Sequence, residues 1–124
     1  MKKANKMLWE GVEEDDFDKV RIALNLKAEM NAKNEYGITP LHVVAADNSL
    51  ELAELLISSG ANLEAKDNRG WTPLTLAARY NHLAVTELLI SSGAEVDVED
   101  DDGWTPLHRA RSQEMKTLLQ GVTI

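Results

Sequence analysis

The sequence predicts an all-α fold, a solenoid of stacked helix-turn-helix units with hairpin-like connections. Two observations predict it. The chain's three prolines, Pro40, Pro73 and Pro106, lie 33 residues apart. A second motif, Leu-Leu-Ile-Ser-Ser-Gly-Ala, starts at Leu55 and recurs at the same interval from Leu88. A helix pair of this size cannot bury its own apolar face, so neighbouring units must stack.

The first helix of a unit is predicted to begin at the Thr-Pro pair. Thr39 is a good N-cap residue, Pro40 suits the first helical position, and Leu41 opens a short apolar stripe. The helix must be short, because Asn48 and its counterpart Asn81 lie where a left-handed residue would end it. We therefore expect a short loop after each first helix.

The second helix is predicted from its amphipathic spacing. Leu52 and Leu56 share one face, whereas Glu51 and Glu54 lie on another, solvated face. Gly60 then ends the helix. The polar, turn-rich segment that follows should form a hairpin-like connection to the next unit.

These motifs resemble the ankyrin repeat. Thr-Pro-Leu-His at residues 39–42 and 105–108 matches its signature, and residues 60–65 match the exit from its second helix. The resemblance covers residues 34–121 directly, and residues 5–33 resemble a degenerate N-terminal cap in which lysine replaces the usual glycine. It implies one ankyrin-repeat domain over residues 1–124, with an N-terminal cap (1–33), two repeats (34–66 and 67–99) and a shortened C-terminal cap (100–124).

The histidines are interpreted as structural. The resemblance implies that His42 and His108 each hold the start of their own helix. Thr75 replaces the motif histidine in the middle unit, where we expect a weaker local joint. His82 is expected to be a loop residue that packs across to the next unit. Since His42 and His108 lie two units apart, about 20 Å in a stack, no shared metal site is predicted.

The last unit departs from the repeat in a way that suggests a cap. Arg109 and Arg111 replace Val43 and Ala45 of the first full unit. We interpret the two arginines as part of a polar outer face, which the end of a solenoid requires for solubility.

Composition and motifs limit the classes of function. The 124 residues contain no cysteine and carry a formal net charge of −8, which disfavours binding to nucleic acid and favours a partner with a basic surface. No apolar run reaches the roughly 20 residues of a membrane span. The acidic run 99–103 fails as a calcium loop, and no catalytic or phosphate-binding motif is present. We expect a soluble, monomeric, cytoplasmic protein that is not an enzyme and uses no cofactor or metal.

Aromatic residues mark the candidate binding surface. Four of the six, Tyr36, Trp71, Tyr80 and Trp104, fall at positions that the resemblance implies are variable and project into a concave groove. Such residues dominate binding hot spots, so we predict that they contact a partner. The alternative is that the tryptophans shield neighbouring hairpins from water. The full predicted partner-binding set is Tyr36, Ile38, Arg69, Trp71, Arg79, Tyr80 and Trp104.

The remaining aromatic residues are assigned to the fold. Trp9 and Phe17 lie among the apolar residues of the N-terminal cap, together with Ile22, and a core role is expected for them. The leading hypothesis is a non-catalytic module that binds a protein or peptide through its concave face and hairpin tips. The alternatives are a structural or inhibitory subunit of a larger assembly, or an engineered binding scaffold.

Overall fold

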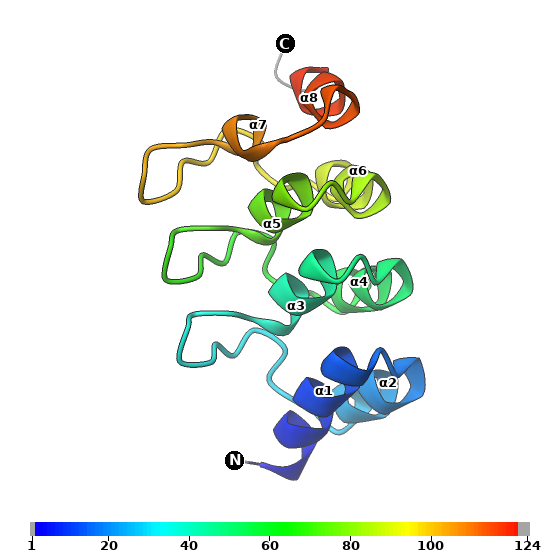
Figure 1. Cartoon of the computed structure of the whole chain (residues 1–124). Helices are drawn as coiled ribbons and strands as arrows, with labels where there is room; N and C mark the ends of the chain where they lie inside the picture. Colours follow the sequence, from blue (N-terminus) through cyan, green and yellow to red (C-terminus); the bar gives the residue numbers. More distant parts are fainter. Residues whose placement is uncertain (1, 122–124) are drawn as a thin grey trace.

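The chain folds into a stack of helix pairs. The computed structural model describes residues 2–121, and none of these residues lies in a β-strand. The first helices of the pairs form one column and the second helices form another (Figure 1). The predicted all-α solenoid is therefore confirmed. The helices are α1 (Lys3–Glu14), α2 (Phe17–Asn25), α3 (Pro40–Ala46), α4 (Leu50–Ser58), α5 (Pro73–Arg79), α6 (Leu83–Ser91), α7 (Pro106–Arg109) and α8 (Gln113–Gln120).

The predicted helix boundaries follow from local chemistry. The Thr39 hydroxyl accepts a hydrogen bond from the backbone N–H of the third residue of α3, and the same cap recurs at Thr72 and Thr105. Asn48 and Asn81 follow α3 and α5 with φ of 58° and 62°, so both take the predicted left-handed conformation. The side-chain cap and the asparagine together confine α3 and α5 to seven residues each.

Second helices also end in a left-handed residue. Gly60 has φ of 101° and Gly93 has φ of 103°, a region that glycine enters without steric cost. Lys27 takes this place after α2 with φ of 69°, so the N-terminal cap keeps the turn at a higher conformational cost.

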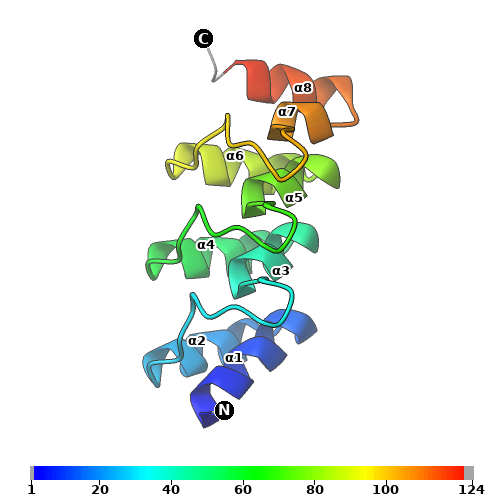
Figure 2. The same cartoon turned by 90° about the vertical axis from the view of Figure 1, so that its left-hand side faces the viewer.

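Three hairpin-shaped connections project from one side of the stack (Figure 1), the side that faces the viewer in Figure 2. Each is closed by a backbone hydrogen bond, for example from Asp67 N–H to the Trp71 carbonyl at 2.9 Å. Neighbouring hairpins are joined as well, because Asn68 N–H donates to the Tyr36 carbonyl at 3.0 Å and Asp101 N–H donates to the Arg69 carbonyl at 2.9 Å. These bonds fix the spacing of the hairpins on which the candidate binding residues stand.

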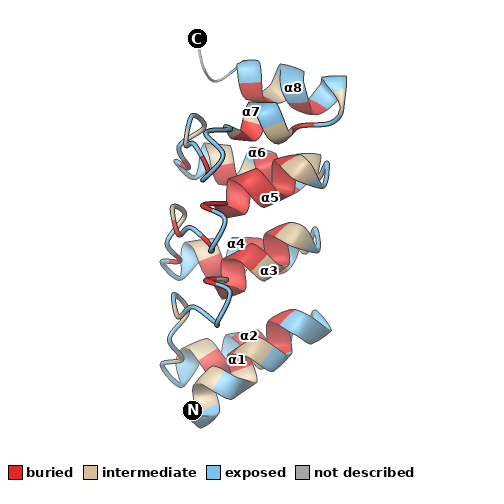
Figure 3. Ribbon diagram, turned by 60° about the vertical axis from the view of Figure 1, so that its left-hand side comes forward, coloured by how far each residue is buried: buried red, intermediate tan, exposed pale blue. Residues whose placement is uncertain are grey.

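The core runs the length of the stack. Buried residues gather where the helix pairs face one another (Figure 3). Leu41 and Leu74 from first helices, and Leu56 and Leu89 from second helices, are at most 1% exposed. The core therefore comes from contacts between units, as the repeat pattern predicts.

The N-terminal cap corrects one expectation. Trp9 packs against the core and is half-buried, but Phe17 is 38% exposed and Ile22 is 40% exposed. Phe17 is the first residue of α2, and its counterparts Leu50 and Leu83 are half-buried. An apolar residue at this position lies at the border of the core, so the expected core role of Phe17 and Ile22 is wrong.

The C-terminal cap corrects a second expectation, that Arg109 and Arg111 both belong to a polar outer face. Helix α7 has only four residues and ends at Arg109, because the next residue, Ala110, has an extended backbone with ψ of 137°. Arg111 is exposed, but the Arg109 side chain is only 14% exposed and forms ion pairs with the last hairpin. Arg109 is therefore not part of a polar outer face, because two carboxylates hold it inward.

Candidate protein-binding surface

Three aromatic side chains stand exposed on the hairpins and first helices. Tyr36, in the first hairpin, is 61% exposed, and Trp104, in the last hairpin, is 47% exposed. Tyr80, the residue that caps the end of α5, is 49% exposed. All three side chains are therefore open to solvent, and their contact with a partner stays a prediction.

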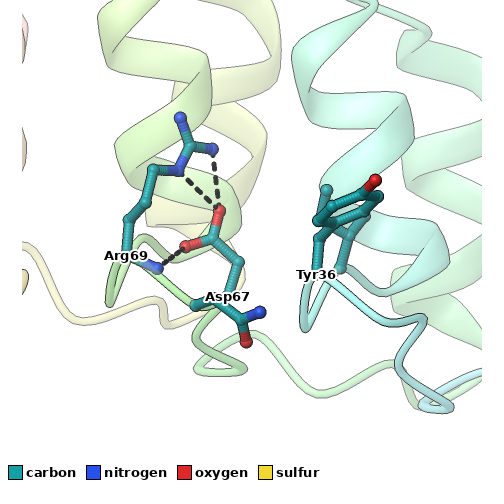
Figure 4. Close-up of a pocket in the computed structure, with 5 residues that line it drawn as sticks. Tyr36, Asp67 and Arg69 are labelled. Atoms are coloured by element: carbon teal, nitrogen blue, oxygen red, sulfur yellow. Dashed lines mark hydrogen bonds and ion pairs between the residues drawn. The ribbon is translucent and has the colours of Figure 1, made fainter.

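Two cavities bring several of the predicted residues together. The first has a volume of about 240 Å³ and lies between neighbouring hairpins, with Tyr36 on one side and Arg69 on the other (Figure 4). The second, of about 280 Å³, is lined by Tyr80, Leu76 and Val43 among others, and it shares Ile38 and Arg69 with the first. Four predicted contact residues therefore line one continuous, largely apolar depression.

Arg69 is held in place by a buried carboxylate. Its Nη2 donates to Asp67 Oδ2 at 2.8 Å, and Asp67 Oδ1 accepts from the backbone N–H groups of Arg69 and Trp71. Burial by itself would raise the pKa of Asp67, but the hydrogen bonds from Arg69 and from these N–H groups outweigh it and hold the pKa below 3.8. The guanidinium is therefore fixed over the depression as one half of an ion pair.

The burial of Trp71 contradicts the prediction that this side chain faces solvent. The side chain is only 8% exposed. The guanidinium carbon of Arg69 lies 3.8 Å from the centre of a Trp71 ring, and that of Arg109 lies 4.9 Å away. Trp71 is thus covered by its own hairpin and by the unit that follows. The alternative interpretation, in which the indole shields hairpins from water, describes this residue.

Trp104 differs because no further hairpin follows it in the described chain. Arg109 lies 4.5 Å from the centre of a Trp104 ring, while Arg109 Nε donates to Asp100 Oδ2 at 2.8 Å and Nη2 donates to Asp102 Oδ2 at 3.0 Å. Burial by itself would raise the pKa of Asp100, but the hydrogen bonds from Arg109 and from the backbone N–H groups of Trp104 and Asp102 together outweigh it and hold the pKa below 3.8. One arginine therefore links both tryptophans to the last hairpin, an arrangement that the sequence reasoning missed. The signal was an arginine at a position occupied by Val43 and Leu76 in the other units.

A buried histidine links α3 to the hairpin that precedes α5. His42 Nδ1 accepts from Thr39 N–H at 3.1 Å, which confirms its predicted role at the helix start. Its Nε2 lies 2.8 Å from the Trp71 carbonyl and donates to it. Burial lowers the pKa of His42, partly opposed by the bond to that carbonyl. His108 makes the same cap bond from Thr105 N–H at 3.0 Å, but its side chain is exposed.

The other predicted residues take different places. His82 Nε2 pairs with the Ala46 carbonyl at 2.9 Å, so it packs against the preceding unit and not, as predicted, the next one. Arg79, the last residue of α5, is half-buried and lines neither cavity. Residues 2–121 hold no group of three histidine, aspartate or glutamate side chains suited to a metal ion, and none of their helices is long and apolar enough to cross a membrane.

The comparisons with known proteins agree with this geometry. A family model described as ankyrin repeats (3 copies) matches residues 8–100 and, in an overlapping match, residues 63–123. A search of curated proteins gave no match to the chain.

Proposed function

The chain belongs to the ankyrin-repeat family, and we propose that it is a non-catalytic module that binds one protein or peptide through its concave face and hairpin tips. Ankyrin repeats are generally protein–protein interaction modules. The observation that carries the proposal is the set of three exposed aromatic residues, Tyr36, Tyr80 and Trp104, on a frame of paired hairpins. Large exposed aromatic side chains are typical of binding hot spots.

The frame supports binding because it is organised before a partner arrives. Arg69 is fixed by Asp67, and Arg109 is fixed by Asp100, so neither guanidinium needs to be ordered on association. Ile38 and Tyr80 supply the apolar lining, while Arg79 stands beside Tyr80 at the end of α5. In this proposal Trp71 supports Arg69 from beneath and makes no direct contact.

The partner is proposed to carry a basic surface, and the protein to act as a cytoplasmic monomer. The net charge of −8 supports the first part, because complementary charge accelerates encounter between proteins. A specific inhibitory or structural role would be a property of the assembly that the partner belongs to.

The test is affinity purification followed by titration. The full chain and a Tyr80→Ala/Trp104→Ala variant are used in parallel as bait, and proteins retained only by the wild type are identified by mass spectrometry. The identified partner is then titrated against Trp104→Ala, which should weaken binding by about 2 kcal/mol, roughly thirtyfold.

The matched control is Ile22→Ala, which removes an apolar side chain that is 40% exposed away from the hairpins. It should leave the affinity unchanged. Equal retention of the partner by wild type and by the double variant would place the interface elsewhere.

A further inference from the structure

A second depression is lined by residues of α2 and α4. These helices stand on the side of the stack opposite the hairpins (Figure 1). A cavity of about 490 Å³ is lined by Phe17, Glu51, Glu54, Leu55 and Ser58. A neighbouring cavity of about 380 Å³ shares Phe17 and Glu51 with it and extends to Asp15 and Leu50. We call this pair of cavities the outer groove. It shares no residue with the depression between the hairpins.

The floor of the outer groove is apolar. Phe17 is 38% exposed, and Leu55 and Leu50 are half-buried beside it. On α4, Glu51, Leu55 and Ser58 follow one another at spacings of three and four residues, so they form one stripe along the helix. The stripe and the Phe17 ring leave apolar surface open to water without another element of the described chain covering it.

The walls of the outer groove carry negative charge that is not compensated. Glu51, Glu54 and Asp15 are exposed, and none of them forms an ion pair within residues 2–121. The two cations of α2 are already paired, Lys19 with Glu14 at 2.8 Å and Arg21 with Asp18 at 3.4 Å.

On the hairpin side, the two buried carboxylates are paired. There, Asp67 is neutralised by Arg69, and Asp100 is neutralised by Arg109. The exposed hairpin residues Glu35 and Asp101 form no ion pair within residues 2–121, so the outer groove differs in placing two unpaired glutamates of one helix beside an exposed phenylalanine ring.

From this combination we infer that the outer groove binds a basic peptide segment of a partner protein, with an apolar side chain seated against Phe17 and Leu55 and lysine or arginine side chains reaching Glu51 and Glu54. The apolar floor supplies the anchor, and the carboxylates select its charge. This site goes beyond the proposed binding through the hairpin side, because it involves different residues on a different face.

Charge argues against other occupants. A second copy of the chain carries a net charge of −8, so its approach to an acidic groove is unfavourable at long range. An anionic membrane surface would be repelled for the same reason. A basic segment is attracted, and the attraction should weaken as salt is added.

The test uses three short capped peptides, each titrated against the full-length chain by fluorescence anisotropy. The first has two leucines flanked by lysines, the second replaces the lysines by glutamates, and the third replaces the leucines by serines. The lysine–leucine peptide should bind saturably and at least about tenfold more tightly than the other two, since it alone satisfies both walls and floor.

Two pairs of matched variants test whether the peptide binds in the outer groove. Glu54→Lys should weaken binding about fivefold, whereas Glu87→Lys, the same change one unit further along, should alter it by less than about twofold. Phe17→Ala should also weaken binding about fivefold, while Ile22→Ala, on the same helix and equally exposed, should have no effect. Thermal unfolding of each variant verifies that the fold is intact.

Several results would overturn the inference. One is equal weakening by Glu54→Lys and Glu87→Lys, which would indicate general attraction to an acidic protein. Others are equal binding of the glutamate–leucine peptide, no saturable binding at all, or self-association of the wild type that Phe17→Ala abolishes. Trp104→Ala should leave peptide binding unchanged, so failure here is distinguishable from failure of the proposed function on the hairpin side.

Discussion

Two contacts in the stack each join one unit to the hairpin of the next unit, but they do so with different chemistry. The first joins the unit of residues 34–66 to the hairpin 67–71 through His42, which is completely buried and donates to the Trp71 carbonyl. The second joins the unit of residues 67–99 to the hairpin 100–104. There Thr75 caps its own helix through Thr72, and Arg109, which is held to the last hairpin by Asp100, reaches back over the Trp71 ring of the preceding unit. We call these the histidine joint and the arginine joint.

The two joints differ in their exposure to solvent and in the type of interaction that forms them. The histidine joint consists of neutral hydrogen bonds in a dry interior, where an unpaired group is costly. The arginine joint consists of charge-assisted bonds and of guanidinium–indole contacts, and its partners range from the buried Asp100 and Trp71 to Trp104 and Asp102, which are exposed. The first joint is therefore closed to water, whereas part of the second is open to it.

The largest effect is expected for Trp71→Ala, because Trp71 lies between the two joints. Its carbonyl belongs to the histidine joint, and its ring is covered by Arg69 and Arg109. Removing a buried indole should lower the free energy of unfolding by about 3 kcal/mol or more in urea denaturation. The control is Trp104→Ala, whose ring is half-exposed and whose loss should cost within about 1 kcal/mol. Equal costs would show that the burial of Trp71 contributes little.

Breaking the histidine joint should come next. His42→Leu keeps an apolar side chain in the interior but leaves Thr39 N–H without its partner, while the Trp71 carbonyl keeps only the bond from Asp67 N–H. The expected loss is about 2 kcal/mol in urea denaturation, the cost of a buried unpaired N–H group and of a lost buried hydrogen bond. His108→Leu is the matched control, because it removes the same cap bond from an exposed site where water can replace it. Its cost should stay below about 1 kcal/mol.

Breaking the arginine joint should cost less. Arg109→Gln removes the charge partner of Asp100, although the backbone N–H groups of Asp102 and Trp104 still donate to that carboxylate. We expect a loss of about 1.5 kcal/mol at neutral pH in urea denaturation. Arg69→Gln provides the comparison, because Arg69 forms a similar pair but its side chain is 50% exposed. A larger loss for Arg69→Gln would contradict the assigned importance of the second joint.

The two joints should also respond differently to mild acid. Burial holds the pKa of His42 in the folded chain below 6.5, so the unfolded chain binds the proton first as the pH falls. The stability associated with neutral His42 is fully present above pH 6.5 and is lost as the pH falls through the folded-state pKa. The pKa of Asp100 is held below 3.8, so the arginine joint loses its stability only at lower pH. Urea denaturation at pH 7 and pH 5 should show a decrease for wild type that is smaller for His42→Leu.

Much of the fold could be predicted from sequence because short local motifs mark where each helix begins and ends. Thr39 and Pro40 start a helix, and Asn48 ends the turn after it, by local interactions that depend on residues only a few positions away. Stacking then follows, since each unit has an apolar face that only a neighbour can cover.

The environment of the candidate site was harder to predict because it depends on residues in other units. Trp71 and Trp104 occupy equivalent repeat positions, yet one is buried and the other is exposed. The cause is the unit that follows: its Arg109 and last hairpin cover Trp71, whereas no further hairpin of the described chain covers Trp104. Phe17 was misplaced for a related reason, because an apolar residue in a terminal cap can lie at the border of the core.

The smallest effect is expected when the histidine joint is copied into the second position. Thr75→His restores the motif residue at a site that is 1% exposed. In the next unit its ring would face the Trp104 carbonyl as His42 faces the Trp71 carbonyl, and it would replace the Thr75 hydroxyl in the helix cap. One added neutral hydrogen bond should raise the free energy of unfolding by about 1 kcal/mol or less, since much of its strength replaces bonds to water. Urea denaturation measures this gain, and in an Arg109→Gln background the gain should be larger, because the new bond then substitutes for the lost one. A loss of stability in both backgrounds would mean that the last hairpin is spaced for arginine alone, and that the two joints are not interchangeable.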